Sequence, residues 1–73
     1  MSVKEIFGRN IHEYRKQNGL SQEELAEQID ISIKHMSNLE TGKVFASAEL
    51  IEKIIEEEAQ NAIVAIKNRI HNR

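Results

Sequence analysis

The segment from Ile33 to Asn38 contains side chains whose chemistry suits contact with nucleic-acid bases. The ammonium group of Lys34 can reach O6 and N7 of guanine, and the amide of Asn38 can pair with N6 and N7 of adenine. Ile33 offers apolar contact, for example with a thymine methyl group. Because a helix over this segment would turn Met36 and Leu39 inward, the outward side chains that could contact bases are Ile33, Lys34, Ser37 and Asn38.

The other residues with chemical potential do not combine into a site. The three histidines, His12, His35 and His71, are too scattered for a local ligand cluster, and the chain has no cysteine. Glu56, Glu57 and Glu58 are consecutive, so on a helix they point in different directions and form a solvated face. No serine–histidine–aspartate pairing or phosphate-binding loop is evident. We therefore expect no metal site, no cofactor and no enzymatic activity.

Composition limits the chain to one small domain. It has 73 residues, contains neither proline nor cysteine, and has a formal net charge of −2. No apolar run approaches the roughly 18 residues needed to cross a bilayer. Lys4 and Glu5 interrupt the start, and no hydrophobic region typical of a signal peptide follows. These features predict a soluble cytoplasmic protein without membrane contact.

The charge is distributed unevenly along the chain. Residues 1–43 are nearly balanced, with six basic and seven acidic residues. Residues 44–58 contain one lysine and five glutamates, whereas residues 59–73 contain three basic residues and no acidic one. The acidity is therefore concentrated in one segment, and the net charge alone does not exclude a nucleic-acid partner.

The elements that must position these residues are helices. Apolar residues recur at helical spacing almost everywhere and strict alternation is absent, which predicts an all-α fold. The first helix should begin near Val3 and end near Asn18-Gly19. Later helices are expected after three serine caps, Ser21 (in a capping box with Glu24), Ser32 and Ser47, and the third should close at Thr41-Gly42.

The second and third of these helices form a predicted helix-turn-helix over Gln22–Thr41. Ala26 must be small because the third helix crosses close to the second at that point. Asp30 occupies a turn position where a left-handed backbone conformation is usual, which aspartate tolerates at some cost. Apolar residues that should seal this unit against the rest of the domain are Leu25, Ile29, Ile31, Met36 and Leu39.

Over roughly residues 6–55 the chain resembles the phage-repressor/Cro-like, xenobiotic-response-element-type DNA-binding domains. The resemblance implies a compact bundle of four to five helices like that of the lambda repressor. It also implies a transcriptional regulator that binds operator DNA as a dimer. The matching residues are Gly8, Ile11, Tyr14-Arg15-Lys16, Gly19 to Ala26, Ile29, Ser32, Ser37, Leu39-Glu40, Gly42-Lys43 and Ser47.

The resemblance also implies roles for individual residues. It adds Ser32 to the base-contacting series, and it places Gln22 on the DNA backbone at a helix N-terminus, where free N–H groups favour phosphate. Thr41 and Lys43, just past the third helix, are expected to be phosphate contacts as well. The family's arginine and glutamate positions match Arg15 and Glu40, which implies a structural ion pair that fixes the angle of the third helix.

The C-terminal part departs from the family pattern. Ala46 stands where a proline is usual, and Glu58-Ala59 replaces an apolar residue followed by glycine. One arrangement has Asn61 capping a separate fifth helix, and the other has a single long helix from Ser47 to Asn72. We favour a break near residues 56–61, because Gln60 and Asn61 are weak helix formers. This gives a DNA-binding domain over residues 1–58 and a C-terminal helix over residues 59–73.

The C-terminal helix carries more apolar surface than a four-helix core needs. Its isoleucines, Ile63, Ile66 and Ile70, predict a dimer interface, although the helix could instead fold back on its own bundle. A homodimer would act as a repressor that reads a near-palindromic operator in double-stranded DNA. The alternative is an antitoxin or interaction module whose last helix binds a protein partner, with autoregulatory DNA binding. A third possibility is the N-terminal domain of a larger regulator.

Overall fold

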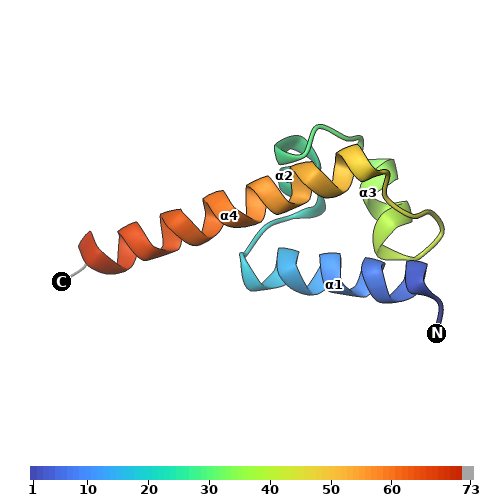
Figure 1. Ribbon diagram of the computed structural model, residues 1–73, viewed down its shortest axis with the longest axis horizontal. Coiled ribbons are helices and arrows are strands. Elements are labelled where there is room, and N and C mark those ends of the chain that lie inside the picture. Colours follow the sequence, from blue (N-terminus) through green and yellow to red (C-terminus); the bar gives the residue numbers. More distant parts are fainter. Residues whose placement is uncertain (72–73) are drawn as a thin grey trace.

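The computed structural model describes the backbone of residues 1–71 and the side chains of residues 1–63. Within this part of the chain there are four α-helices and no strand (Figure 1). The expected all-α helical bundle is confirmed. The helices are α1 (Val3–Gln17), α2 (Gln22–Gln28), α3 (Ile33–Glu40) and α4 (Ala48–His71).

Each helix begins directly after a serine whose hydroxyl accepts a hydrogen bond from the backbone N–H three residues later. This bond satisfies one of the N–H groups that a helix start leaves without a partner. The capping box predicted at Ser21 and Glu24 is present, and an equivalent box at Ser2 and Glu5 begins α1. The four capping pairs are Ser2 with Glu5, Ser21 with Glu24, Ser32 with His35, and Ser47 with Leu50.

The turns between the first three helices use a left-handed backbone conformation. Gly19 after α1 has φ of 65°, and Asp30 between α2 and α3 has φ of 58°. The conformation expected for Asp30 is therefore confirmed. Because a side chain in this region costs roughly 1–2 kcal/mol relative to glycine, the turn holds some strain.

The core forms where α1, α2 and α3 meet. Leu25, Ile29, Met36 and Leu39 are almost completely buried, as the helix-turn-helix pattern predicts. The small side chain of Ala26 is also buried, which is consistent with the close crossing of α2 and α3. Among residues 1–63, the other buried apolar side chains are Ile11 in α1, Ala46 in the loop before α4, and Leu50 in α4.

α1 approaches the end of α3 at Gly8. A Cβ atom at that position would lie 2.2 Å from the backbone oxygen of Leu39 and 2.8 Å from that of Glu40. Only a residue without a side chain permits this contact, because the backbone of α3 cannot move aside as a flexible side chain could. The glycine therefore sets the distance between α1 and α3.

The expected break near residues 56–61 is wrong, because α4 is one continuous helix of 24 residues. The segment contains neither glycine nor proline. Asparagine and glutamine in a helix interior cost only a few tenths of a kcal/mol, which is too little to end a helix. Asn61 also links α4 to α1, because its side-chain amide donates a hydrogen bond to the hydroxyl of Tyr14.

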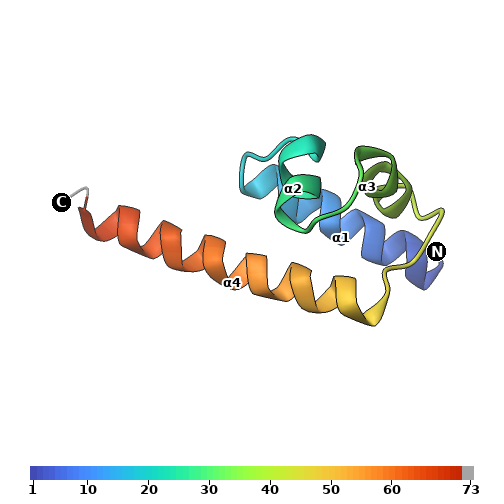
Figure 2. The same ribbon diagram turned by 90° about the horizontal axis from the view of Figure 1, so that it is seen from above.

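Only the first part of α4 lies beside the bundle, and the rest extends well past it (Figure 2). Leu50 is buried and Ile54 is half-buried, whereas Ile55 is 59% exposed and Ile63 is 45% exposed. The side chains of Ile66 and Ile70, the other two predicted interface residues, lie outside the described residues. Within the described residues, no helix has both the length and the apolar character needed to span a membrane.

Candidate nucleic-acid interface

The outer face of α3 carries the residues expected to contact bases. Ser32, Ile33 and Lys34 are exposed at its first turn, and Ile33 is 50% exposed although it is apolar. Met36 and Leu39 on the opposite face are fully buried in the core. The amphipathic pattern of α3 therefore turns its first-turn side chains away from the protein, where another molecule can reach them.

The second half of this face is less open. Ser37 and Asn38 are half-buried, and Thr41 and Lys43 just beyond the helix are exposed. The Thr41 hydroxyl donates a 2.9 Å hydrogen bond to the backbone oxygen of Ser37. Thr41 would have to release this bond before its hydroxyl could donate to a phosphate, whereas the ammonium group of Lys43 has no such requirement.

Gln22 connects the N-terminus of α2 to the C-terminus of α3. Its side-chain nitrogen Nε2 donates a 3.2 Å hydrogen bond to Oε1 of Glu40. One of the two amide hydrogens is used in this way, which leaves the second free for a phosphate oxygen. The glutamine expected on the DNA backbone is thus held in place by α3.

Glu40 is the centre of a hydrogen-bonded cluster that joins α1, α2 and α3. Arg15 Nε lies 2.7 Å from Glu40 Oε2, and Arg15 Nη2 lies 3.1 Å from Glu40 Oε1. The two side chains are only 10% and 5% exposed. Arg15 Nη1 also donates a 3.0 Å hydrogen bond to the backbone oxygen of Leu20. The structure thus brings together the two residues of the expected ion pair.

His12 belongs to the same cluster, although the sequence analysis did not single it out. Its Nδ1 atom lies 3.0 Å from Glu40 Oε1 and 3.2 Å from Arg15 Nη2. A single ring nitrogen either donates to the carboxylate or accepts from the guanidinium, so these two bonds exclude each other. His12 and Arg15 are three residues apart, which places both on one face of α1. This spacing is the sequence feature from which the position of His12 beside the ion pair could have been predicted.

The pKa values reflect how tightly the cluster is bonded. Burial by itself would raise the pKa of Glu40, but hydrogen bonds from Arg15, His12 and Gln22 outweigh this effect and lower that pKa. The hydrogen bond to Glu40 raises the pKa of Arg15. Both groups are therefore charged across the neutral range, and each neutralises the other.

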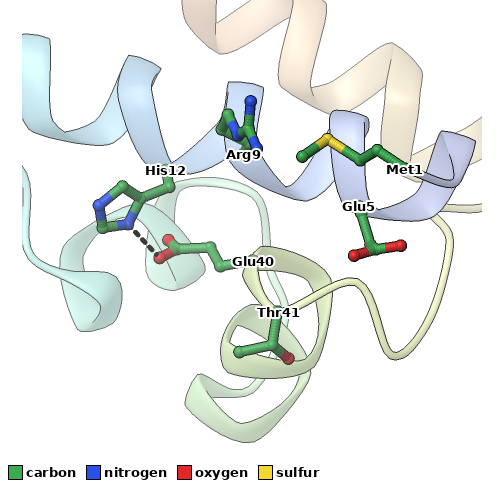
Figure 3. A pocket seen from close by; sticks show the side chains of 6 residues that line it. All are labelled: Met1, Glu5, Arg9, His12, Glu40 and Thr41. Atoms are coloured by element: carbon green, nitrogen blue, oxygen red, sulfur yellow. Dashed lines mark hydrogen bonds and ion pairs between the residues drawn. The ribbon is translucent and has the colours of Figure 1, made fainter.

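A shallow pocket of about 290 Å³ opens between α1 and the end of α3 (Figure 3). Arg9 and His12 line it from α1, and Glu40 and Thr41 line it from the end of α3. Arg9 is exposed and is a second residue of this region, after His12, to which the sequence analysis gave no role. No group of three histidine or acidic residues within the described residues is arranged to hold a metal ion.

The outer face of α3 is free of acidic side chains, because the only acidic residue of that helix is the buried Glu40. The exposed acids belong to other elements. Those of α2 are Glu23, Glu24 and Glu27, and those of α4 are Glu49, Glu52, Glu56 and Glu58. Exposed acids also lie at Glu5 and Glu13 in α1 and at Asp30 in the turn before α3, so the absence of exposed acid is a property of the outer face of α3 itself.

Comparison with known proteins agrees with this geometry. The model of a family described as helix-turn-helix domain matches residues 6–56, which is more than half of the chain. The search of curated proteins found no match. The matched span contains α2, α3 and every residue expected to contact DNA, and it agrees with the resemblance to the phage-repressor/Cro-like domains. The chain therefore belongs to the helix-turn-helix domain family.

Proposed function

We propose that the protein is a sequence-specific transcriptional regulator that acts on cytoplasmic DNA as a dimeric repressor. In this proposal α3 enters the major groove of a near-palindromic operator. Lys34 contacts guanine and Asn38 contacts adenine, and these contacts provide most of the selectivity. The smaller or apolar neighbours that complete the base-contacting series are Ser32, Ile33 and Ser37.

The observation that carries this proposal is the removal of Glu40 from the surface of α3. A carboxylate on this helix would repel the phosphates on either side of the groove. Its side chain is instead 5% exposed and paired with Arg15. The cation of Lys34 is consequently the only formal charge on the exposed surface of α3.

Contacts to the DNA backbone would hold α3 in register. The second amide hydrogen of Gln22 and the ammonium group of Lys43 can reach phosphates on the two sides of the groove, and Thr41 can join them after releasing Ser37. Such contacts supply affinity without reading sequence. With few cations available, non-specific affinity should be modest, and a dimer with two copies of α3 would be needed for tight binding.

A dimer is supported by the apolar residues of α4 that the bundle leaves uncovered. Ile63 is 45% exposed, and the sequence continues the apolar series at Ile66 and Ile70. Two copies related by a two-fold axis would present two α3 helices to successive turns of DNA, about 34 Å apart. We therefore propose residues 59–73 as the dimerisation element of a domain whose DNA-binding part is residues 1–58.

Selection of binding sites from random double-stranded DNA tests the proposed function. The expected result is one enriched motif with two inverted half-sites about 10 base pairs apart. The matched control is a variant with Lys34→Ala and Asn38→Ala, which should enrich no motif while retaining the circular dichroism spectrum of the parent. Recovery of unrelated sequences by the parent protein would refute sequence-specific binding.

The projecting part of α4 also favours a second candidate, an antitoxin whose α4 binds a toxin. A substitution that separates the two is Ile63→Glu. In the repressor it should abolish dimerisation and operator binding together. In the antitoxin it should release a co-expressed protein encoded beside this gene.

A further inference from the structure

An apolar groove of about 290 Å³ runs between α1 and the first half of α4. Ile55 on its rim is 59% exposed, even though isoleucine is among the residues most often found buried. The side chains that line it are mainly apolar, and they include Phe7, Ile11, Tyr14, Ile51, Ile54 and Ile55. This groove is apolar surface that the chain does not cover with any of its described residues.

The sequence of α4 continues the face that Ile55 begins. Ala59, Ala62, Ile66 and Ile70 follow Ile55 at intervals of three or four residues, which places all five positions on one face of the continuous helix. Ile55, at the start of this face, lines the groove, and the end of the face belongs to the part of α4 that extends beyond the bundle (Figure 2). One molecule therefore has both an apolar groove and a projecting segment with apolar residues.

The charges of α4 distinguish its two halves. Residues 49–58 contain five glutamates and one lysine, whereas residues 59–71 contain Lys67 and Arg69 and no acidic residue. Two copies of α4 aligned in parallel would place the acidic halves together and the basic halves together. Two antiparallel copies would place each acidic half beside a basic half, which is the favourable arrangement.

We infer that the groove is occupied by residues 63–70 of a second copy of this chain, so that the two α4 helices pair in an antiparallel manner. The two-fold axis would pass between Ala59 and Ala62, whose small side chains allow the helices to approach closely. Around this axis Ile55 pairs with Ile66 of the second copy, and Ile51 pairs with its Ile70. The inference rests on the proposed dimer and specifies how its two copies pair.

The antiparallel pairing also sets the distance between the two bundles, and this distance suits the proposed DNA binding. With the axis between Ala59 and Ala62, the first residues of the two α4 helices are about 38 Å apart, since a helix rises about 1.5 Å per residue. Each bundle lies beside the beginning of its own α4 (Figure 2). The two bundles would therefore sit at opposite ends of the pair, at a spacing close to one turn of DNA, about 34–36 Å.

Disulfide cross-linking tests whether the two α4 helices are antiparallel. The parent chain has no cysteine, so only the introduced cysteines can form a disulfide. Ile55→Cys and Ile66→Cys are prepared as separate full-length variants and oxidised in a glutathione buffer. In the antiparallel pair, residue 55 of one chain lies about 16 Å along the helix axis from residue 55 of the other chain, and the same holds for residue 66. Neither variant alone should therefore form a covalent dimer. The equimolar mixture should form a disulfide between the two different variants.

A charge exchange provides an independent test. Helical spacing puts positions 52 and 67 on the same flank of the apolar face, so antiparallel pairing would bring position 52 near position 67 of the second copy, a glutamate near a lysine. Glu52→Lys alone and Lys67→Glu alone should each raise the dimer dissociation constant about tenfold, and mixing the two variants should restore the parent value. The control is Glu27→Lys, which makes the same charge change on α2 and should leave dimerisation unchanged.

The outcomes separate the inference from the proposed function. A covalent dimer formed by Ile66→Cys alone, with an unaltered dimer dissociation constant for Glu52→Lys, would overturn the antiparallel arrangement but leave a dimer in place. A parent protein that sediments as a monomer at tens of micromolar would overturn both the dimer and the inference. Operator binding, measured separately, decides whether the regulator assignment survives either result.

Discussion

Arg15 Nε in α1 donates a 2.7 Å hydrogen bond to Glu40 Oε2 at the last residue of α3. The bond joins the first helix of the chain to the end of the helix proposed to contact DNA bases. The same carboxylate also accepts from Gln22 at the start of α2. The Glu40 carboxylate therefore joins α3 to both of its neighbours, to α1 through the ion pair and to α2 through the hydrogen bond from Gln22.

Removing the arginine should destabilise the fold strongly. In Arg15→Ala the buried Glu40 keeps only weaker partners, and the free energy of unfolding should fall by about 3–5 kcal/mol, as measured by urea denaturation. The matched control is Lys16→Ala, which removes the exposed cation next in sequence and should change stability by less than about 0.5 kcal/mol. A loss below about 1 kcal/mol for Arg15→Ala would show that the pair contributes little.

Stability should fall in acid. The pKa of Glu40 is lowered in the folded protein, and hydrogen bonds from Ser2 and Ser21 backbone groups lower the pKa of Glu5 and Glu24. The unfolded chain therefore takes up protons first as the pH falls, near the usual value of 4.5. The stabilisation is complete above that pH and is lost as the pH falls through the lower folded values.

Urea unfolding measured at intervals from neutral pH down to about pH 3 would record this dependence. The stability of Glu40→Gln should be lower at neutral pH and should decline less steeply in acid, because its residue 40 cannot take up a proton. Parallel curves for Glu40→Gln and the parent would contradict a role for Glu40 in the acid dependence.

Gly8→Ala should destabilise the fold despite the better helix propensity of alanine. The added methyl group would overlap the backbone oxygens of Leu39 and Glu40, so α1 and α3 must separate. Overpacking typically costs about 1–3 kcal/mol, and the 2.2 Å approach to rigid backbone places Gly8→Ala at the upper end, so the cost outweighs the roughly 1 kcal/mol that alanine gains in a helix. Thermal unfolding measures the effect, and Glu13→Ala at an exposed position of α1 is the control. An unchanged or higher melting temperature for Gly8→Ala would contradict the close contact.

Lys43→Ala and Lys34→Ala should weaken DNA binding in different ways. Lys43→Ala should lower affinity about equally for all sequences and reduce the salt dependence by about one phosphate contact. Lys34→Ala should relax discrimination at one base pair, by about 1–3 kcal/mol. Fluorescence anisotropy over a range of salt concentrations separates the two effects, with Lys16→Ala as the control. Equal loss of sequence discrimination in both variants would refute the division between base and phosphate contacts.

The local features of the first three helices could be predicted because each depends on a few neighbouring residues. The capping box of Ser21 with Glu24, the left-handed Asp30 and the burial of Met36 and Leu39 all follow from short-range spacing. The capping box of Ser2 with Glu5 has the same sequence signature as the predicted one and was overlooked.

Two other features that were missed involve contacts between distant residues. The expected break in α4 overestimated the effect of Asn61, whose hydrogen bond to Tyr14 spans 47 positions of the sequence. His12 and Glu40 are 28 positions apart in the sequence, and they meet only because α1 packs against α3. The assignments of DNA contacts and of the dimer interface stay predictions, because they concern molecules outside this chain.

The placement of the exposed glutamates on α2 and α4 has a consequence for the kinetics of encounter with DNA. A molecule that approaches a duplex with α2 or the first half of α4 in front meets repulsion from the phosphates, whereas one that approaches with α3 in front does not. In the proposed function, the acidic surfaces would therefore disfavour misoriented collisions. A negative net charge slows the overall approach, but its uneven placement would raise the fraction of collisions with DNA that begin in the proposed binding orientation.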